Sequence, residues 1–126
     1  MYIHFDPNPC GRASGDCVIR ALCMALNKSW DEIYIGLCVQ GYMMCEWGNH
    51  NAVWPAYLKR YGFRKYTILD ASPDCYSVKD FCRDYKVGTF VLCTGDHVVC
   101  IIDGNYYDAW DSGAECPVFY FKYEAL

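Results

Sequence analysis

The sequence predicts an α+β protein, in which helices come first and an antiparallel β-sheet follows. The first half of the chain carries helical patterns with start and stop signals, whereas the part after residue 87 consists of four β-rich runs separated by turns. A length of 126 residues with 54% hydrophobic side chains is enough for one buried core and too short for two. We therefore expect one domain over residues 1–126, with N-terminal helices packed on a C-terminal antiparallel sheet.

The first helix is expected over residues 17–27, after a segment that is rich in turn-forming residues. Asp16 is its predicted N-cap residue, and such a side chain normally points at the free backbone N–H groups of the first turn. The helix, "CVIRALCMALN", is apolar on nearly every side, which is typical of a central, buried helix. Arg20 interrupts this apolar run, so we expect it to pair with an acidic side chain inside the fold.

Two longer segments and several short ones follow this helix. Ser29 and Glu32 have the spacing of a capping box, which opens a second helix that ends near residue 44. A third helix is expected over residues 51–61, because Gly62 is a typical residue just past a helix end. After it we expect a short strand, a turn and a short helix, over residues 65–69, 71–76 and 77–85.

The four β-rich runs cover residues 88–94, 97–103, 105–111 and 117–123. Asp103-Gly104 lies between the second and third runs and is typical of a two-residue hairpin turn. In that register Asp108 lies on the same face as His97, one diagonal step away, whereas a three-residue loop would place Asp111 opposite His97. Because Asp-Gly favours the two-residue turn, we predict that Asp108 contacts His97 and keep Asp111 as the alternative.

Cys17 is the predicted nucleophile, because it occupies the first position of the buried helix. The positive end of a helix dipole stabilises an anion, and the thiolate is the nucleophilic form of cysteine. Such chemistry also needs a base and a group that orients the base. Of the three histidines, His97 opens a strand, where a base is held rigidly, whereas His4 and His50 lie in turn-rich segments.

The start of the same helix supplies a group that could stabilise an oxyanion, the backbone N–H of Cys17. A second donor is expected from a polar side chain just before the helix. Asn8 is the predicted donor, with Arg12 and Ser14 as alternatives. Trp47, in the loop "CEWGNH", is expected either to anchor that loop or to line a substrate groove.

Composition excludes several other classes of function. The net charge is −4 and no long run of Lys or Arg occurs, so no nucleic-acid partner is expected. No apolar stretch approaches a membrane span and no signal peptide is present, so we expect a cytoplasmic protein without a membrane partner. Most of the 10 cysteines lie in apolar runs, as small hydrophobic residues do in a reducing compartment, and no C-x-x-C occurs. We expect no metal site and no cofactor.

Two stretches resemble a known group of enzymes. "GDCVIRAL" (residues 15–22) resembles the nucleophile helix of the papain-like cysteine peptidase superfamily, and "GDHVVCIIDGNYYDAWDSG" (residues 95–113) resembles its histidine strand and the strand that follows. The likeness is to the compact bacterial and phage branch, which includes bacteriocin-leader peptidases and NlpC/P60 amidases. It implies a papain-like fold, Cys17 as nucleophile, His97 as general base and Asp108 as its orienter. These families place a Gln six residues before the nucleophile, where this chain has Gly11.

The sequence and the resemblance together predict a thiol hydrolase. We expect it to cleave a peptide or isopeptide amide in a protein or peptide substrate, through a thioester on the nucleophile. One alternative is an acyltransferase or transglutaminase-type enzyme with the same triad. The other is a catalytically inactive binding module on the same fold.

Overall fold

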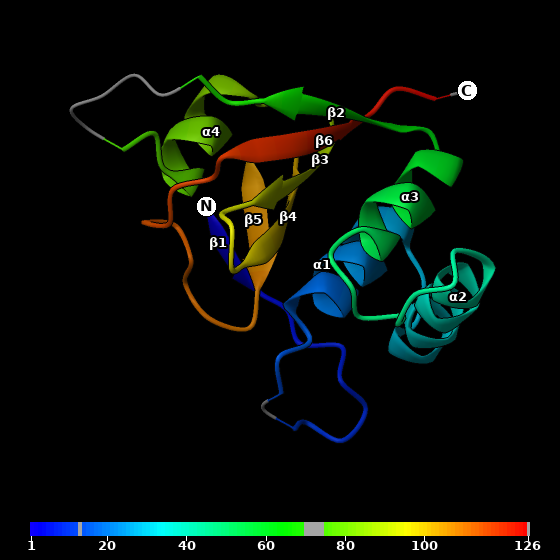
Figure 1. Ribbon diagram of the computed structural model, residues 1–126. Coiled ribbons are helices and arrows are strands. Elements are labelled where there is room, and N and C mark those ends of the chain that lie inside the picture. The colour runs from blue at the N-terminus through cyan, green and yellow to red at the C-terminus, as the bar shows by residue number, and fades with distance from the viewer. Residues whose placement is uncertain (13, 70–74, 126) are drawn as a thin grey trace.

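A six-stranded mixed β-sheet lies between two layers of helices (Figure 1). The computed structural model describes residues 1–12, 14–69 and 75–125. Across the sheet the strands run in the order β1-β5-β4-β3-β6-β2. The strands are β1 (Tyr2–His4), β2 (Phe63–Thr67), β3 (Thr89–Cys93), β4 (Val98–Ile102), β5 (Asn105–Asp108) and β6 (Phe119–Tyr123). The helices are α1 (Cys17–Leu26), α2 (Trp30–Met43), α3 (Val53–Arg60) and α4 (Val78–Asp84).

Alternating side chains along the central strands create two cores, one on each face of the sheet. Val91 and Cys93 of β3 belong to the core that α1, α2 and α3 cover, whereas Phe90 and Leu92 belong to the core beneath α4. In Figure 1, α4 accordingly lies apart from the other three helices. Helix α1 packs directly on β3, β4 and β5, so that it is the central helix of its layer.

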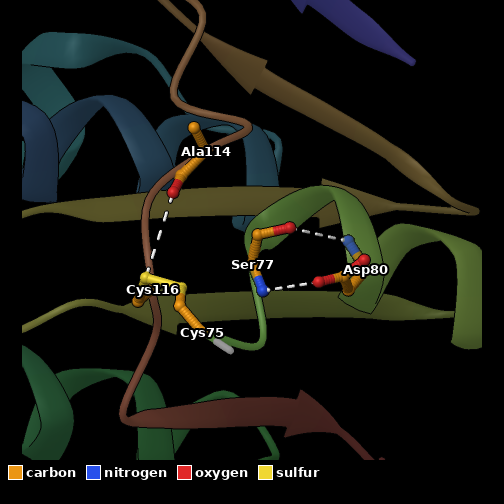
Figure 2. Close-up of a disulfide and its surroundings, with 5 residues drawn as sticks. All are labelled: Cys75, Ser77, Asp80, Ala114 and Cys116. Carbon is orange, nitrogen blue, oxygen red and sulfur yellow. Dashed lines mark hydrogen bonds between the residues drawn. A yellow bond between two sulfur atoms is a disulfide. The ribbon is translucent and has the colours of Figure 1, made fainter. Parts of the chain in front are cut away.

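The predicted helix starts are confirmed to within a few residues. Ser29 and Glu32 form a complete capping box at α2, and Ser77 and Asp80 form another at α4 (Figure 2). Helix α1 ends at Leu26, and its C-cap residue Asn27 adopts a left-handed conformation with φ of 53°. None of the helices within the described ranges is both long enough and apolar enough to cross a membrane.

The hairpin between β4 and β5 has the predicted two-residue turn. Asp103 and Gly104 both have positive φ, 50° and 80°, as the tightest hairpin turn requires. The register pairs Ile102 with Asn105, and it continues along both strands toward Asp108. The turn therefore fixes which side chains of β5 lie on the same face as those of β4.

The α+β class is confirmed, but the prediction of a wholly antiparallel, C-terminal sheet is wrong. Strand β1 from the N-terminus adds to the sheet edge parallel to β5, with His4 paired with Asp108. Strand β2 forms the other edge, antiparallel to β6, and begins at Phe63, two residues before the predicted strand. The turn predicted over residues 71–76 falls mostly on positions 70–74, which lie outside the described residues.

One disulfide joins Cys75, just before α4, to Cys116 in the segment between β5 and β6 (Figure 2). Their Cα atoms are 5.8 Å apart. Backbone hydrogen bonds hold the two segments side by side, from Val78 N–H to the Glu115 carbonyl at 2.9 Å among others. The expectation of reduced thiols is therefore wrong for this pair, while the other cysteines are free.

Candidate active site

Cys17 is half-buried at the N-terminus of α1, facing the start of β4. Burial raises the pKa of its thiol, but hydrogen bonds to the His97 side chain and to the backbone of Val98 oppose this effect. The positive charges of His97 and Arg20 lower the pKa of the thiol further, so that it lies below the ordinary thiol value. The environment therefore favours a thiolate at this position.

The other shifted thiols behave in the opposite way. Burial holds the pKa of Cys23 at about 12 and also raises the pKa values of Cys82, Cys93 and Cys100. Buried thiols in apolar surroundings are unreactive for this reason. In the part of the chain that the structure describes, Cys17 is thus the cysteine whose surroundings lower its pKa.

His97 is buried directly before β4 and connects Cys17 to Asp108. Its Nε2 lies 2.6 Å from Oδ2 of Asp108, which leaves Nδ1 for the hydrogen bond with Cys17. Burial lowers the pKa of the imidazole, but the hydrogen bonds to Asp108 and Cys17 outweigh it and raise the pKa to about 9. His97 is therefore protonated at neutral pH. The ring of Trp110 lies beside it, with centroids 4.8 Å apart.

Asp108 is almost fully buried at the end of β5. Its carboxylate accepts hydrogen bonds from several neighbouring donors. Burial raises the pKa of its carboxyl, but hydrogen bonds from His97 and Ser112 lead the opposing effects, and the net pKa is lowered. The Ser112 hydroxyl donates to Oδ2 at 2.7 Å, and the backbone N–H of Ala109 donates to Oδ1 at 2.8 Å. Two nitrogens of Arg20 also reach Oδ1, at 3.1 and 3.3 Å. Asp108 is therefore an ionised, firmly held acceptor for His97.

Arg20 links Asp108 to the start of α1, which confirms that it pairs with acids inside the fold. Its Nη1 donates to Oδ1 of Asp16 at 2.6 Å. The second oxygen of Asp16 accepts from Trp30 Nε1 at 2.9 Å and from the Asn8 amide at 3.3 Å. The prediction that the Asp16 side chain caps the helix is therefore wrong, because stronger charge-assisted bonds hold it elsewhere.

This arrangement has a chemical consequence at the helix start. The first N–H groups of a helix have no partner within the helix, and here the N-cap side chain does not accept from them. They stay available to an oxyanion that forms next to Cys17. The negative charge of Asp16 is also offset by Arg20, so it opposes a thiolate less than its position in the sequence suggests.

The remaining predicted residues lie as follows. The Asn8 amide donates to the Arg12 carbonyl and to the Asp16 carboxylate, both at 3.3 Å. Its predicted role as an oxyanion donor therefore stays a prediction. The structure does not bring Asp111 to His97, because its carboxylate accepts from the Tyr106 hydroxyl and the Gly113 N–H instead. Of the side chains that contact Asp108, Ser112 was missed, and no local sequence signal distinguishes it.

A cleft of about 720 Å³ lies at the N-terminus of α1, between the segment before α1 and the helices α1, α2 and α3. The chain neighbours of Cys17 on both sides, Asp16 and Val18, line it, and so does Trp47. The volume lies within the range of small-molecule and side-chain binding sites. Trp47 lines this cleft, and its predicted contact with substrate stays a prediction.

No three His, Cys, Asp or Glu side chains within residues 1–12, 14–69 and 75–125 are grouped so that they could hold a metal ion. No family model, curated protein or solved structure matches this chain. The site itself joins three side chains by hydrogen bonds: the Cys17 thiol, whose pKa is lowered, the His97 imidazole, whose pKa is raised, and the buried carboxylate of Asp108.

Proposed function

We propose that this chain is a papain-like thiol hydrolase that cleaves a peptide or isopeptide amide. One observation carries the proposal: the one thiol with a lowered pKa among those with shifted values is hydrogen-bonded to a buried His–Asp pair. The opposite pKa shifts of Cys17 and His97 are those of a thiolate–imidazolium pair. The placement of a nucleophile helix on a sheet whose strands carry the His and the Asp supports a papain-like arrangement.

In the first half of the reaction, Sγ of Cys17 attacks the carbonyl carbon of the substrate. The carbonyl oxygen becomes an oxyanion, which the free N–H groups at the start of α1 stabilise, with Asn8 as the proposed side-chain donor. His97 gives its proton from Nδ1 to the leaving amine, and the C–N bond breaks. The product of this half is a thioester on Cys17.

In the second half, neutral His97 takes a proton from a water molecule. The water oxygen attacks the thioester carbonyl, and the C–S bond breaks to release a carboxylic acid and the Cys17 thiolate. Asp108 holds the imidazole by its Nε2–H throughout and stabilises the imidazolium when it forms. No cofactor takes part in this proposal, and a cytoplasmic location remains part of it.

A burst experiment with p-nitrophenyl acetate tests the proposal without knowledge of the natural substrate. We expect rapid release of one p-nitrophenolate per chain, and an acetyl group on Cys17 in the peptide mass spectrum. Cys17→Ala should abolish the burst, while Cys45→Ser, which changes an exposed free thiol, should retain it. An equal burst in the Cys17→Ala protein would overturn the proposal.

Added amines separate hydrolysis from acyl transfer in the same assay. If water is the acceptor, acetate forms at a rate that does not depend on the amine. If the acetyl group passes mainly to the amine, the enzyme is a transferase with this triad. Absence of any acetyl-Cys17 would favour an inactive binding module.

A further inference from the structure

We propose that the cleft beside Cys17 binds a large, uncharged aromatic or aliphatic side chain of a peptide substrate. This inference rests on the proposed function, because it assigns the cleft to the substrate of that site. Three features of the cleft support it: its position, its aromatic lining and its pairing of charges.

The cleft lies at the start of α1, where Cys17 is the first residue of the helix. Asp16 and Val18, the residues before and after Cys17, both contribute to its wall. Asn8, the proposed oxyanion donor, lines it as well. Cys17 itself does not line the cleft, so the proposal requires a substrate that extends from the thiol past Asn8 and Asp16 into it.

Four of the lining residues are aromatic. Trp30 and Tyr34 stack with ring centroids 5.1 Å apart, and Trp47 and Trp54 also line the cleft. Trp47 is 80% exposed, so a large apolar surface faces solvent in the free protein. Covering such a surface with another apolar group is favourable in proportion to the area removed from water.

The charges of the lining argue against a charged side chain. Asp16 is the one carboxylate among the lining residues, and it is already paired with Arg20 and bonded to Trp30. A Lys or Arg side chain would therefore lose its hydration without gaining a free acid. Arg12, the cation of the lining, is exposed rather than enclosed. The buried part of the cleft thus suits an uncharged group.

Two alkylating probes of similar intrinsic reactivity test the preference. We would measure the rate of Cys17 alkylation by N-(2-phenylethyl)chloroacetamide and by N-(2-aminoethyl)chloroacetamide, each divided by its rate with free glutathione. Burial of the phenyl ring should make the first probe about tenfold faster or more. Trp47→Ala should remove most of this preference. Tyr42→Ala changes an aromatic residue of similar exposure, 83%, that does not line the cleft, and should retain it.

A non-covalent measurement makes the test independent of the thiol. Three of the four tryptophans, Trp30, Trp47 and Trp54, line the cleft, so tryptophan fluorescence reports its occupancy. In the Cys17→Ala protein, we expect N-acetyl-phenylalaninamide to change the fluorescence saturably and N-acetyl-lysinamide to leave it unchanged.

The outcomes separate the two proposals. If iodoacetamide labels Cys17 selectively but neither assay shows a preference for the phenyl group, the cleft assignment is overturned and the hydrolase proposal stands. If Cys17 is not selectively labelled but the fluorescence titration saturates, the cleft assignment stands and the hydrolase proposal fails. If neither response is seen, both are overturned.

Discussion

At the residue scale, Asp108 divides its two oxygens between two tasks. Oδ2 accepts from His97 and Ser112, which orients the imidazole, while Oδ1 accepts from Arg20 and from the backbone of Ala109. A carboxylate with this many donors stays ionised even though it is buried. The same side chain therefore supports both the charge of His97 and the attachment of α1 to the sheet.

Replacing each candidate aspartate separates their contributions. Asp108→Asn removes the charge that raises the pKa of His97, so the pKa of Cys17 should rise in turn. Alkylation of Cys17 at about pH 6 should then slow, because a smaller fraction of the thiol is ionised. Asp111→Asn is the matched control, because Asp111 contacts Tyr106 rather than His97, and it should leave the rate unchanged. A larger loss in Asp111→Asn than in Asp108→Asn would contradict this account.

The coupled shifts of Cys17 and His97 predict how stability depends on pH. The raised pKa of His97 contributes stability below its unfolded value near 6.5, and this contribution is lost as pH rises toward about 9. The lowered pKa of Cys17 acts in the opposite direction, because the folded protein releases a proton that the unfolded thiol keeps. The two effects offset each other in the native protein between these pH values.

Cys17→Ala removes the effect of the thiol and also the part of the His97 shift that Cys17 causes, and it leaves the part that Asp108 causes. Relative to the native protein, this variant should therefore lose stability as the pH is raised above about 6.5, until His97, now held by Asp108 alone, has lost its proton. Urea unfolding at several pH values measures the difference, and other titrating groups cancel in the comparison. If the difference in unfolding free energy between the variant and the native protein does not change with pH, the pKa values of Cys17 and His97 are not coupled.

At the element scale, Arg20 fastens the N-terminus of α1 to the end of β5. It is buried, and it bridges Asp16 on its own helix to Asp108 on the strand. Removing one member of a buried ion pair leaves an uncompensated charge, which costs about 3–5 kcal/mol. Here two carboxylates would lose their partner at once.

Arg20→Met should therefore lower the free energy of unfolding by about 3–5 kcal/mol in urea titrations. Lys28→Met removes a partly exposed ion pair with Glu32, in which the two charged atoms are 3.8 Å apart, and should change stability by less than about 1 kcal/mol. Similar losses in the two variants would mean that the buried bridge does not stabilise α1.

Elements with local signals could be predicted from the sequence, and those that depend on distant partners could not. The Asp103-Gly104 turn fixes its own register, so Asp108 rather than Asp111 was correctly placed beside His97. Strand β1 has three residues and pairs with β5 about a hundred positions away, so no periodicity reveals it. The prediction for the Asp16 side chain is wrong because tertiary packing sets its partners, and Trp30 is one of them.

At the scale of the whole molecule, the disulfide ties the α4 layer to the segment that follows β5. Cys75 lies before α4 and Cys116 lies 41 residues further along the chain, beyond Ser112 and its contact with Asp108. The pairing of Cys75 with Cys116 could not be predicted, because ten cysteines allow many possible disulfide connectivities and the sequence does not show which of them lie close together. The cleft could not be predicted from the sequence either, because three helices and the N-terminal segment form it together.

Loss of the disulfide should destabilise the fold measurably. A loop of this length predicts a loss of about 2–4 kcal/mol in unfolding free energy for the double variant Cys75→Ser with Cys116→Ser. The control Cys45→Ser replaces an exposed free thiol and should leave stability nearly unchanged. Equal unfolding midpoints for the double variant and the native protein would contradict a stabilising role for this bridge.

The central claim is that Cys17 is a thiolate activated by His97, and brief labelling with substoichiometric iodoacetamide at about pH 6 tests it most directly. An ordinary thiol is almost wholly protonated at that pH, whereas an activated one is not. We expect peptide mass spectrometry to find the label on Cys17, and His97→Asn to remove this selectivity. Label spread over the exposed thiols Cys10, Cys38 and Cys45 instead would contradict the claim.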